Sequence, residues 1–164
     1  MAILILTTGG TFDKEYDELT GALDFRSTHV PKMLELGRCR LEVRVRSWKL
    51  KDSLELSEDE REEIAVACRD AEERQIVVTH GTDTMIETGG VIARAIAGVG
   101  KTVVLTGAMI PFAFGSSDGL FNLGSALSFA QALPPGVYIA MNGRWFAWDD
   151  CRKNRDLGVF ERLR

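Results

Sequence analysis

The sequence has few of the residues that metal sites and disulfide frameworks need. Its 164 residues include three cysteines and two histidines, and no C-x-x-C pair. Cys39, Cys68 and Cys151 are odd in number and far apart, which is typical of a reduced, cytosolic protein. The ligand clusters that zinc requires are also missing. We therefore expect a cytoplasmic protein without a metal.

Long apolar runs, basic leader segments and a strong positive charge are missing too. The first apolar run, residues 2–6, is short, follows no basic region and leads directly into a glycine-rich turn. It predicts a strand rather than a signal peptide. The formal net charge of −4 disfavours nucleic acid and anionic membranes as main partners, because both would repel the protein.

Nucleotide-binding fingerprints are absent as well. Gly9 and Gly10 follow the first apolar run, but the residues around them match neither G-x-G-x-x-G nor a P-loop. A glycine pair still permits a tight turn and lets a ligand approach backbone amides closely. We therefore expect a small-molecule substrate and no cofactor.

What the sequence does have is the composition of an ordinary globular domain. Hydrophobic residues make up 45% of it and charged residues 27%, which are average values. A chain of this length buries roughly 70% of its unfolded surface, enough for a full core. No linker or repeat divides the chain, so one domain spanning residues 1–164 is predicted.

Five apolar runs rich in β-branched residues predict the strands of one sheet. They are Ile3–Leu6, Leu41–Trp48, Ile76–Thr79, Thr102–Leu105 and Val137–Met141. All but the second are apolar on both faces, as is typical of strands buried in a parallel sheet. The second alternates with charged residues such as Arg44 and Arg46, so we expect it at a sheet edge with one face in water.

Four helices are expected between these strands, at about residues 31–36, 57–74, 84–96 and 118–132. A capping box of Ser57 and Glu60 begins the second helix, and Thr84 and Glu87 repeat this pattern at the third. The order of elements predicts an α/β fold, doubly wound, with a mostly parallel sheet, helices on both faces and right-handed crossovers.

The candidate chemistry lies in three polar loops that follow predicted strands, at residues 7–11, 80–84 and 142–153. In such a fold, ligands bind outside the carboxyl ends of the strands, near the point where the strand order reverses. The loops supply threonine hydroxyls, the carboxylate of Asp83 and the amine of Lys153. A threonine hydroxyl becomes a useful nucleophile only beside a base or a polarising group, and these two residues are the candidates for that role.

Taken singly, the polar loop residues also have structural interpretations. Thr84 fits the cap of one helix, and Ser117 and Asp118 fit the cap of the next. Asp83 fits a carboxylate stabilised by a helix N-terminus. Lys153 fits a solvated lysine in a charged loop. His80 is interpreted as a packed or hydrogen-bonded loop residue without a chemical role. No one of these residues identifies an enzyme.

The loops nevertheless carry four motifs in a fixed order. Residues 8–11 are T-G-G-T, and residues 80–85 are H-G-T-D-T-M. Gly-Ala-Met at 107–109 precedes D-G-x-F-N-L at 118–123, and residues 150–153 form D-x-x-K. In this order, over nearly the whole chain, the motifs resemble those of the bacterial L-asparaginase/glutaminase family, in a short form with the N-terminal catalytic domain only.

The resemblance implies a hydrolase that converts L-asparagine to L-aspartate and ammonia through a threonine nucleophile. Thr11 would be that nucleophile, and Tyr16 would help to activate it. Thr82, Asp83 and Lys153 would form a second polar triad that polarises the amide or the attacking group.

The resemblance also implies how the substrate is held. Asp83, with Thr82, would bind the α-amino group, and Ser53 would bind the α-carboxylate. The C-terminal domain usual in the family would be absent. We expect a homodimer to close the open side of the site, because two-fold association is the commonest form of oligomer.

Two other functions stay open at this point. The chain could bind asparagine or aspartate without turnover, or it could be the glutaminase-like subunit of an amidotransferase with a partner chain. The hydroxyls of Thr11 and Thr82 and the amine of Lys153 favour the enzyme, because a sensor needs only the carboxylate.

Overall fold

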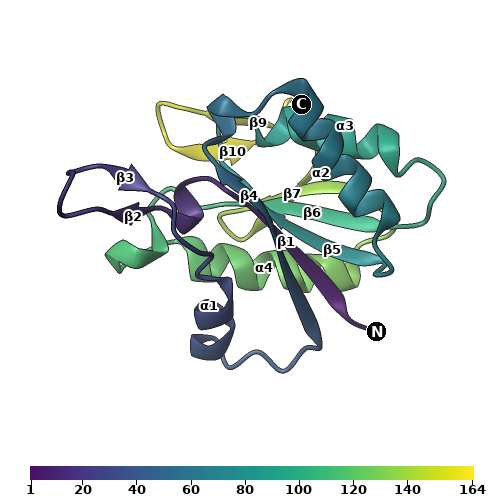
Figure 1. The fold of residues 1–164 in the computed structure, drawn as a ribbon. Helices are drawn as coiled ribbons and strands as arrows, with labels where there is room; N and C mark the ends of the chain where they lie inside the picture. Colours follow the sequence, from purple (N-terminus) through teal and green to yellow (C-terminus); the bar gives the residue numbers. More distant parts are fainter.

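A six-stranded sheet forms the centre of the computed structural model, which describes residues 1–164 (Figure 1). The strand order is β4-β1-β5-β6-β7-β8, and only β8 runs antiparallel to its neighbour. The strands are β1 (Ile3–Gly9), β4 (Val43–Lys51), β5 (Gln75–Thr79), β6 (Thr102–Thr106), β7 (Gly136–Met141) and β8 (Arg144–Ala147). The predicted mostly parallel sheet is confirmed.

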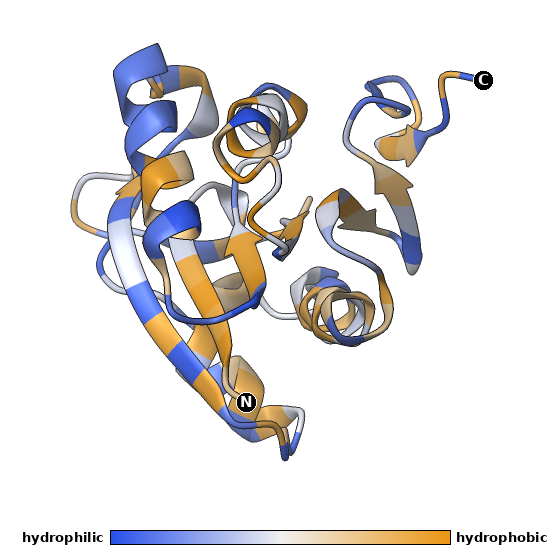
Figure 2. Cartoon of the chain, turned by 90° about the vertical axis from the view of Figure 1, so that its right-hand side faces the viewer, coloured by the Kyte–Doolittle hydropathy of each residue, from blue (hydrophilic) through white to orange (hydrophobic).

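The edge position of β4 is also confirmed. This strand pairs only with β1, and Arg44 and Arg46 are exposed. Figure 2 shows hydrophilic and hydrophobic residues alternating along it, beside the hydrophobic β1. β1 itself is buried along its whole length, because it lies between two strands and under helices on both faces.

Four helices cover the two faces of the sheet, as predicted. In Figure 1, α2 (Glu58–Asp70) and α3 (Met85–Ala95) lie above it, and α1 (Val30–Leu36) and α4 (Gly119–Ala132) lie below it. Two separate apolar clusters fill the spaces between the layers. No helix is long and apolar enough to span a membrane.

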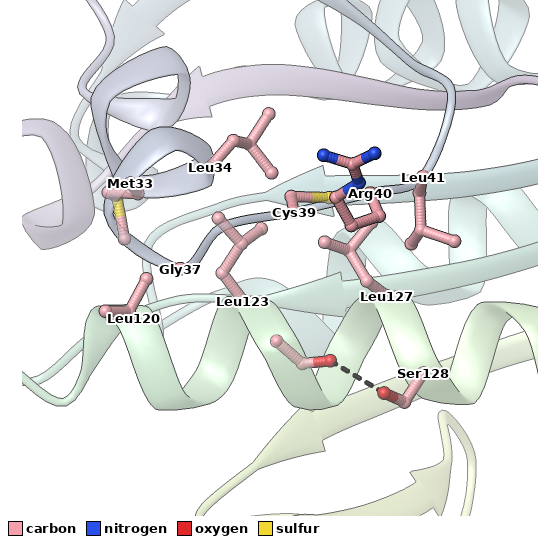
Figure 3. A pocket seen from close by; sticks show the side chains of 11 residues that line it. Met33, Leu34, Gly37, Cys39, Arg40, Leu41, Leu120, Leu123, Leu127 and Ser128 are labelled. Atoms are coloured by element: carbon pink, nitrogen blue, oxygen red, sulfur yellow. Dashed lines mark hydrogen bonds between the residues drawn. The ribbon is translucent and has the colours of Figure 1, made fainter.

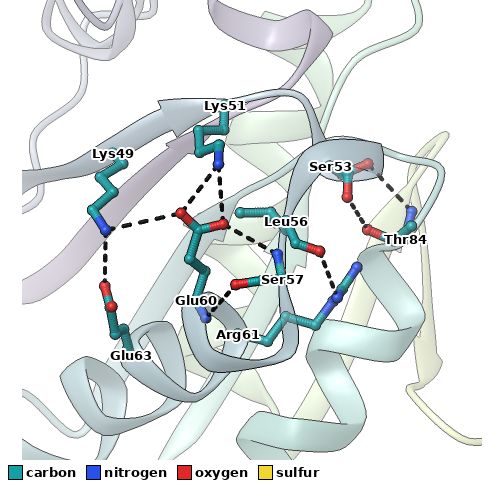
Figure 4. Close-up of polar contacts among 9 residues, drawn as sticks. All are labelled: Lys49, Lys51, Ser53, Leu56, Ser57, Glu60, Arg61, Glu63 and Thr84. Atoms are coloured by element: carbon teal, nitrogen blue, oxygen red, sulfur yellow. Dashed lines mark hydrogen bonds and ion pairs between the residues drawn. The ribbon is translucent and has the colours of Figure 1, made fainter.

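The predicted capping box at the start of α2 is present. The Ser57 hydroxyl accepts a hydrogen bond from the Glu60 N–H at 3.2 Å, and the Glu60 carboxylate accepts one from the Ser57 N–H at 3.1 Å (Figure 4). Glu60 also binds Lys51 at the end of β4, at 3.1 Å. The helix ends at Asp70 rather than near Arg74, because the next residue, Ala71, adopts an extended conformation.

The caps expected from Thr84 and Asp118 are wrong, whereas the Ser117 hydroxyl does accept from the Gly119 N–H at the start of α4, at 2.9 Å. The Thr84 hydroxyl makes no cap to α3 and instead donates to the Ser53 carbonyl at 2.9 Å. Asp118 makes no side-chain cap to α4 and instead accepts from the N–H groups of Met109 and Ile110. In both cases a partner in a neighbouring loop replaces the local partner, and local sequence pattern contains no sign of it.

Two hairpins and the last strand of the sheet were not predicted. The hairpins pair β2 (Glu15–Tyr16) with β3 (Leu23–Asp24), and β9 (Arg152–Asn154) with β10 (Val159–Glu161). Their strands have only two or three residues, too few to show a period. As a result, residues 142–153, expected as one loop, contain β8 and the start of β9.

Candidate active site

The residues predicted to form the site lie at the carboxyl edge of the sheet, where the order of the strands reverses. The chain leaves β1 for β4 on one side and then returns to β5 on the other side. The loops that follow β1 and β5 therefore lie next to each other at this edge, which is where α/β folds bind ligands.

Glycines allow these loops to touch through their backbones. A Cβ on Gly10, whose φ is +76°, would lie 2.4 Å from the Cα of Gly81. A Cβ on Gly81 would lie 2.6 Å from the Ser53 side chain, and one on Gly107 would lie 2.4 Å from the His80 carbonyl oxygen. No larger residue fits at these three positions without moving a loop, so glycine sets the spacing of the site.

Thr82, Asp83 and Lys153 come together as the sequence predicts. The Lys153 Nζ donates to the Thr82 Oγ1 at 2.7 Å and to the Asp83 Oδ1 at 2.9 Å, across about 70 residues of sequence. Lys153 lies on β9 rather than in a loop, and only 13% of its side chain is exposed. Its amine is therefore held against a hydroxyl and a carboxylate rather than in bulk water.

A residue that was not predicted, Arg155, completes this cluster. Its guanidinium Nη1 lies 2.7 Å from the same oxygen of Asp83 that Lys153 contacts. The hydrogen bond from Lys153, together with the charges of both cations, lowers the pKa of Asp83 below its ordinary value despite partial burial. The main cause of this lowered pKa is the hydrogen bond from Lys153, which stabilises the carboxylate form of Asp83.

Thr11 follows the glycine turn and begins a short 3-10 helix, Thr11–Asp13. It is half-buried, and its hydroxyl forms no hydrogen bond with the rest of the chain. The turn is fixed on both sides: Gly10 N–H donates to the Lys51 carbonyl at 2.9 Å, and Phe12 is buried in the apolar cluster below the sheet. The loop thus presents an unpaired hydroxyl from a fixed backbone.

Tyr16 is not brought to Thr11. It lies on β2, 56% exposed, with its hydroxyl near Gly21 in the turn of its own hairpin. The Tyr16 hydroxyl forms no hydrogen bond within the chain. In this arrangement it does not contact Thr11, the residue that it is expected to activate.

Ser53 lies in the loop after β4, fully buried against Gly81. Its hydroxyl accepts a hydrogen bond from the Thr84 N–H at 3.3 Å, and its carbonyl accepts the Thr84 hydroxyl (Figure 4). A hydroxyl that accepts in this way keeps its own proton to donate to an anion. Thr84 therefore positions Ser53 instead of capping a helix.

Asp118 and Asn122 shape the loop after β6, and sequence reasoning assigned neither this role. The Asp118 carboxylate accepts from two backbone N–H groups, and the Asn122 amide donates to the Gly107 carbonyl at 2.9 Å. Asn122 also accepts from the Asn142 N–H at 3.1 Å, which ties this loop to the one after β7. Both belong to the D-G-x-F-N-L motif, which is the signal that could have indicated them.

His80 has a structural role, in agreement with its sequence interpretation. It is fully buried, with Nδ1 2.8 Å from the Gly81 carbonyl and Nε2 2.8 Å from the Thr88 hydroxyl. Burial lowers its pKa to about 4. The neutral ring, protonated at Nδ1 because its partner there is a carbonyl, locks the loop after β5 to α3.

A separate apolar pocket of about 280 Å³ lies between α1 and α4 (Figure 3). Leucines dominate its lining, and Arg40 is the one charged residue. None of the residues of the threonine, lysine and aspartate cluster lines it, so we do not place the chemistry there. No group of three or more His, Cys, Asp or Glu side chains is arranged to hold a metal ion.

Known proteins contain a region similar in sequence to this chain. The family model "Asparaginase, N-terminal" matches residues 2–159. The chain is 31% identical over 165 residues to the L-asparaginase of Thermococcus kodakarensis, covering 97% of this chain and 49% of that protein. It is 30% identical to a glutamyl-tRNA(Gln) amidotransferase subunit of Methanopyrus kandleri, covering 96% of this chain and 36% of that protein.

The fold agrees with these relatives. The thermostable L-asparaginase from Thermococcus kodakarensis superposes with a TM-score of 0.84 at 30% sequence identity. The match covers 99% of this chain and 51% of that chain. The chain thus spans about half the length of the L-asparaginases that it matches.

Buried His80 should make the folded protein sensitive to acid. Between pH 6.5 and about 4 the unfolded chain binds a proton at this histidine that the folded chain does not bind. The contribution of His80 to stability is therefore intact above pH ~6.5 and is lost as pH falls, by about 2 kcal/mol between pH 7 and 5. Urea unfolding at both pH values measures this change. A His80→Gln variant with the same pH dependence as the wild type would show that another group controls it.

Proposed function

The chain belongs to the asparaginase family, and from this premise we propose that it hydrolyses the side-chain amide of L-asparagine to L-aspartate and ammonia. The observation that carries the proposal is the Lys153 ammonium, which donates to both Thr82 and Asp83 beside the loop of Thr11. A hydroxyl, a carboxylate and a sheltered amine at a strand switch point are the groups that acyl transfer from an amide requires.

Thr11 is the proposed nucleophile. Its hydroxyl has no partner to compete with a substrate, and its backbone is fixed by the turn at Gly10. The Thr11 oxygen would attack the amide carbon, ammonia would leave, and water would release L-aspartate from the resulting ester. Tyr16 takes part in this reaction only if the β2–β3 hairpin moves toward Thr11, because its hydroxyl lies near Gly21 in the turn of that hairpin.

Lys153 and Thr82 are the proposed proton-transfer pair. Their contact of 2.7 Å is within the distance that general acid–base catalysis needs. The Lys153 ammonium can donate a proton to the Thr82 oxygen as the Thr82 hydroxyl passes its own proton to the leaving nitrogen. Asp83 stabilises the ammonium form of Lys153.

Ser53 and Asp83 are the proposed anchors for the two ends of the substrate backbone. The Ser53 hydroxyl has a proton to donate to the α-carboxylate, and the ionised Asp83 attracts the α-ammonium. Ser53 lies against Gly81, and Asp83 is two residues further along the same loop, so a bound amino acid would lie across the carboxyl edge of β5.

A second candidate function is a glutaminase-like subunit of an amidotransferase. The resemblance to the amidotransferase subunit of Methanopyrus kandleri favours it. In that case a partner chain would be needed for physiological turnover. A cytoplasmic location and a homodimer stay predictions from the sequence.

Ammonia release from L-asparagine and L-glutamine by the purified chain tests the proposal. We expect release from L-asparagine without a partner. Release from L-glutamine alone would favour the amidotransferase function. Binding of L-aspartate without release from either amide would indicate a binding module and contradict the enzyme.

Thr11→Ala should abolish turnover and leave the fold intact. The hydroxyl makes no hydrogen bond within the chain, so its loss costs little stability, while loss of a nucleophile lowers kcat by at least ~10³-fold. Thr20→Ala is the matched control, because Thr20 is exposed in the hairpin turn, and it should retain normal turnover. Ammonia release and thermal unfolding of both variants are the measurements. Near-normal turnover by Thr11→Ala would rule out this nucleophile.

Lys153→Met should reduce turnover more than it reduces binding of L-aspartate. The substitution keeps the apolar stem and removes the amine, and general acid–base assistance is typically worth ~10²–10⁴-fold. Lys32→Met, an exposed lysine on α1, is the control and should have no effect. The assignment fails if Lys153→Met loses aspartate affinity and stability together, because Lys153 would then be a structural residue.

A further inference from the structure

Arg155 is a charged residue at the candidate site for which the proposed reaction has no role. It lies in the turn between β9 and β10, with its side chain 66% exposed, and its guanidinium contacts the Asp83 Oδ1 at 2.7 Å. Lys153 contacts the same oxygen at 2.9 Å. Two cations thus share one oxygen of Asp83.

Because Lys153 and Arg155 both contact Asp83, the local charge that a substrate meets is positive rather than negative. Lys153, Arg155 and Asp83 together carry a net charge of +1, although Asp83 alone would attract an ammonium group. An incoming α-ammonium would be a third cation at one carboxylate. Both bound cations lie on Oδ1, so an ammonium group at either oxygen of Asp83 meets their repulsion, whereas a carboxylate of the substrate does not.

The other carboxylates near this edge are buried or already paired, and Asp13, two residues after Thr11, is fully buried. Asp52, beside Ser53, is paired with Lys14 at 2.8 Å and accepts from the Leu54 N–H. Asp118 accepts from backbone N–H groups and from the Asn122 amide. The recognition of an α-amino group at this edge therefore depends on Asp83, and Arg155 controls access to it.

We propose that Arg155 is a specificity-determining residue that occupies the subsite of the substrate α-ammonium. This inference rests on the proposed function, in which Asp83 anchors that group. With the guanidinium in place, the α-amino group contributes little to binding. The site then accepts ω-amides of dicarboxylic acids both with and without an α-amino group.

The exposure of Arg155 determines how far its ion pair with Asp83 lowers the affinity for ligands with an ammonium group. An ion pair with one largely exposed partner is weak, because solvent screens it and the long side chain loses freedom when it is held. A substrate ammonium therefore displaces the guanidinium at a cost of about twofold to fivefold in affinity. Removing Arg155 should recover this factor for ligands that have an ammonium group, and only for them.

The hairpin offers a closely matched control. Arg152 has the same charge and nearly the same exposure, 65%, but pairs with Glu161 at 2.8 Å instead of Asp83. Arg152→Ala and Arg155→Ala thus remove the same charge from the same hairpin. Only the second variant removes a cation from Asp83, which then keeps Lys153 as its one cationic partner.

Binding of L-aspartate and succinate to the wild type and both variants, measured by calorimetry, tests the proposal. These ligands differ in the α-amino group alone. In Arg155→Ala, we expect the ratio of aspartate affinity to succinate affinity to rise about twofold to fivefold, with no change in Arg152→Ala. An unchanged or lower ratio in Arg155→Ala would overturn the proposal, as would an equal change in both variants.

The binding assay separates this proposal from the proposed function, because it needs no turnover. If the ratio shifts as expected but no amide is hydrolysed, the amidohydrolase proposal fails and the role of Arg155 stands. If amides are hydrolysed and the ratio stays constant, only the role of Arg155 fails. If neither ligand binds to any of the three proteins, the anchoring role of Asp83 fails and the proposal for Arg155 fails with it.

Discussion

A Cβ on Gly10 would lie 2.4 Å from the Cα of Gly81, and this close approach is the constraint on which the site depends. It lets the loop after β1 lie directly against the loop after β5, at the point where the strand order reverses. Gly81 in turn touches Ser53 in the loop after β4. Three loops from distant parts of the sequence are thus held by backbone contacts, and rigid contacts of this kind are what a site needs to keep its geometry.

Much of the fold could be predicted because its signals are local. Strands such as Thr102–Thr106 are apolar on both faces, and the alternation in Val43–Lys51 correctly indicated the edge of the sheet. The capping box at Ser57 involves residues three apart, so pattern alone reveals it. The same pattern at Thr84 failed, because its hydroxyl bonds instead to the carbonyl of Ser53, 31 residues earlier in the chain. Local pattern is reliable where the partner is local.

In the candidate site, too, local pattern identified residues but not their distant partners. The motifs at Thr11, Thr82–Asp83 and Lys153 indicated the residues, but not the geometry that joins them. Lys153 lies on a three-residue strand that has no visible period, and its contact with Asp83 spans 70 residues. A helix N-terminus was expected to favour the charge on Asp83, and the hydrogen bond from this lysine is instead the main cause of its lowered pKa. Arg155 has no place in any motif, and its importance comes only from where the hairpin puts it.

The contact between Gly10 and Gly81 holds the site together, and Gly10→Ala would break it. Gly98→Ala is the matched control, since Gly98 has a φ of +74° and no atom within 4 Å of an added Cβ, whereas Gly10 has a φ of +76° and a severe clash. The measurement is the affinity for L-aspartate, with the free energy of unfolding recorded for both variants. We expect Gly98→Ala to lose about 1 kcal/mol to backbone strain and to keep its affinity. Gly10→Ala should lose ~1–3 kcal/mol more and bind L-aspartate at least tenfold more weakly. Equal stability and equal affinity in the two variants would show that this contact does not hold the site together.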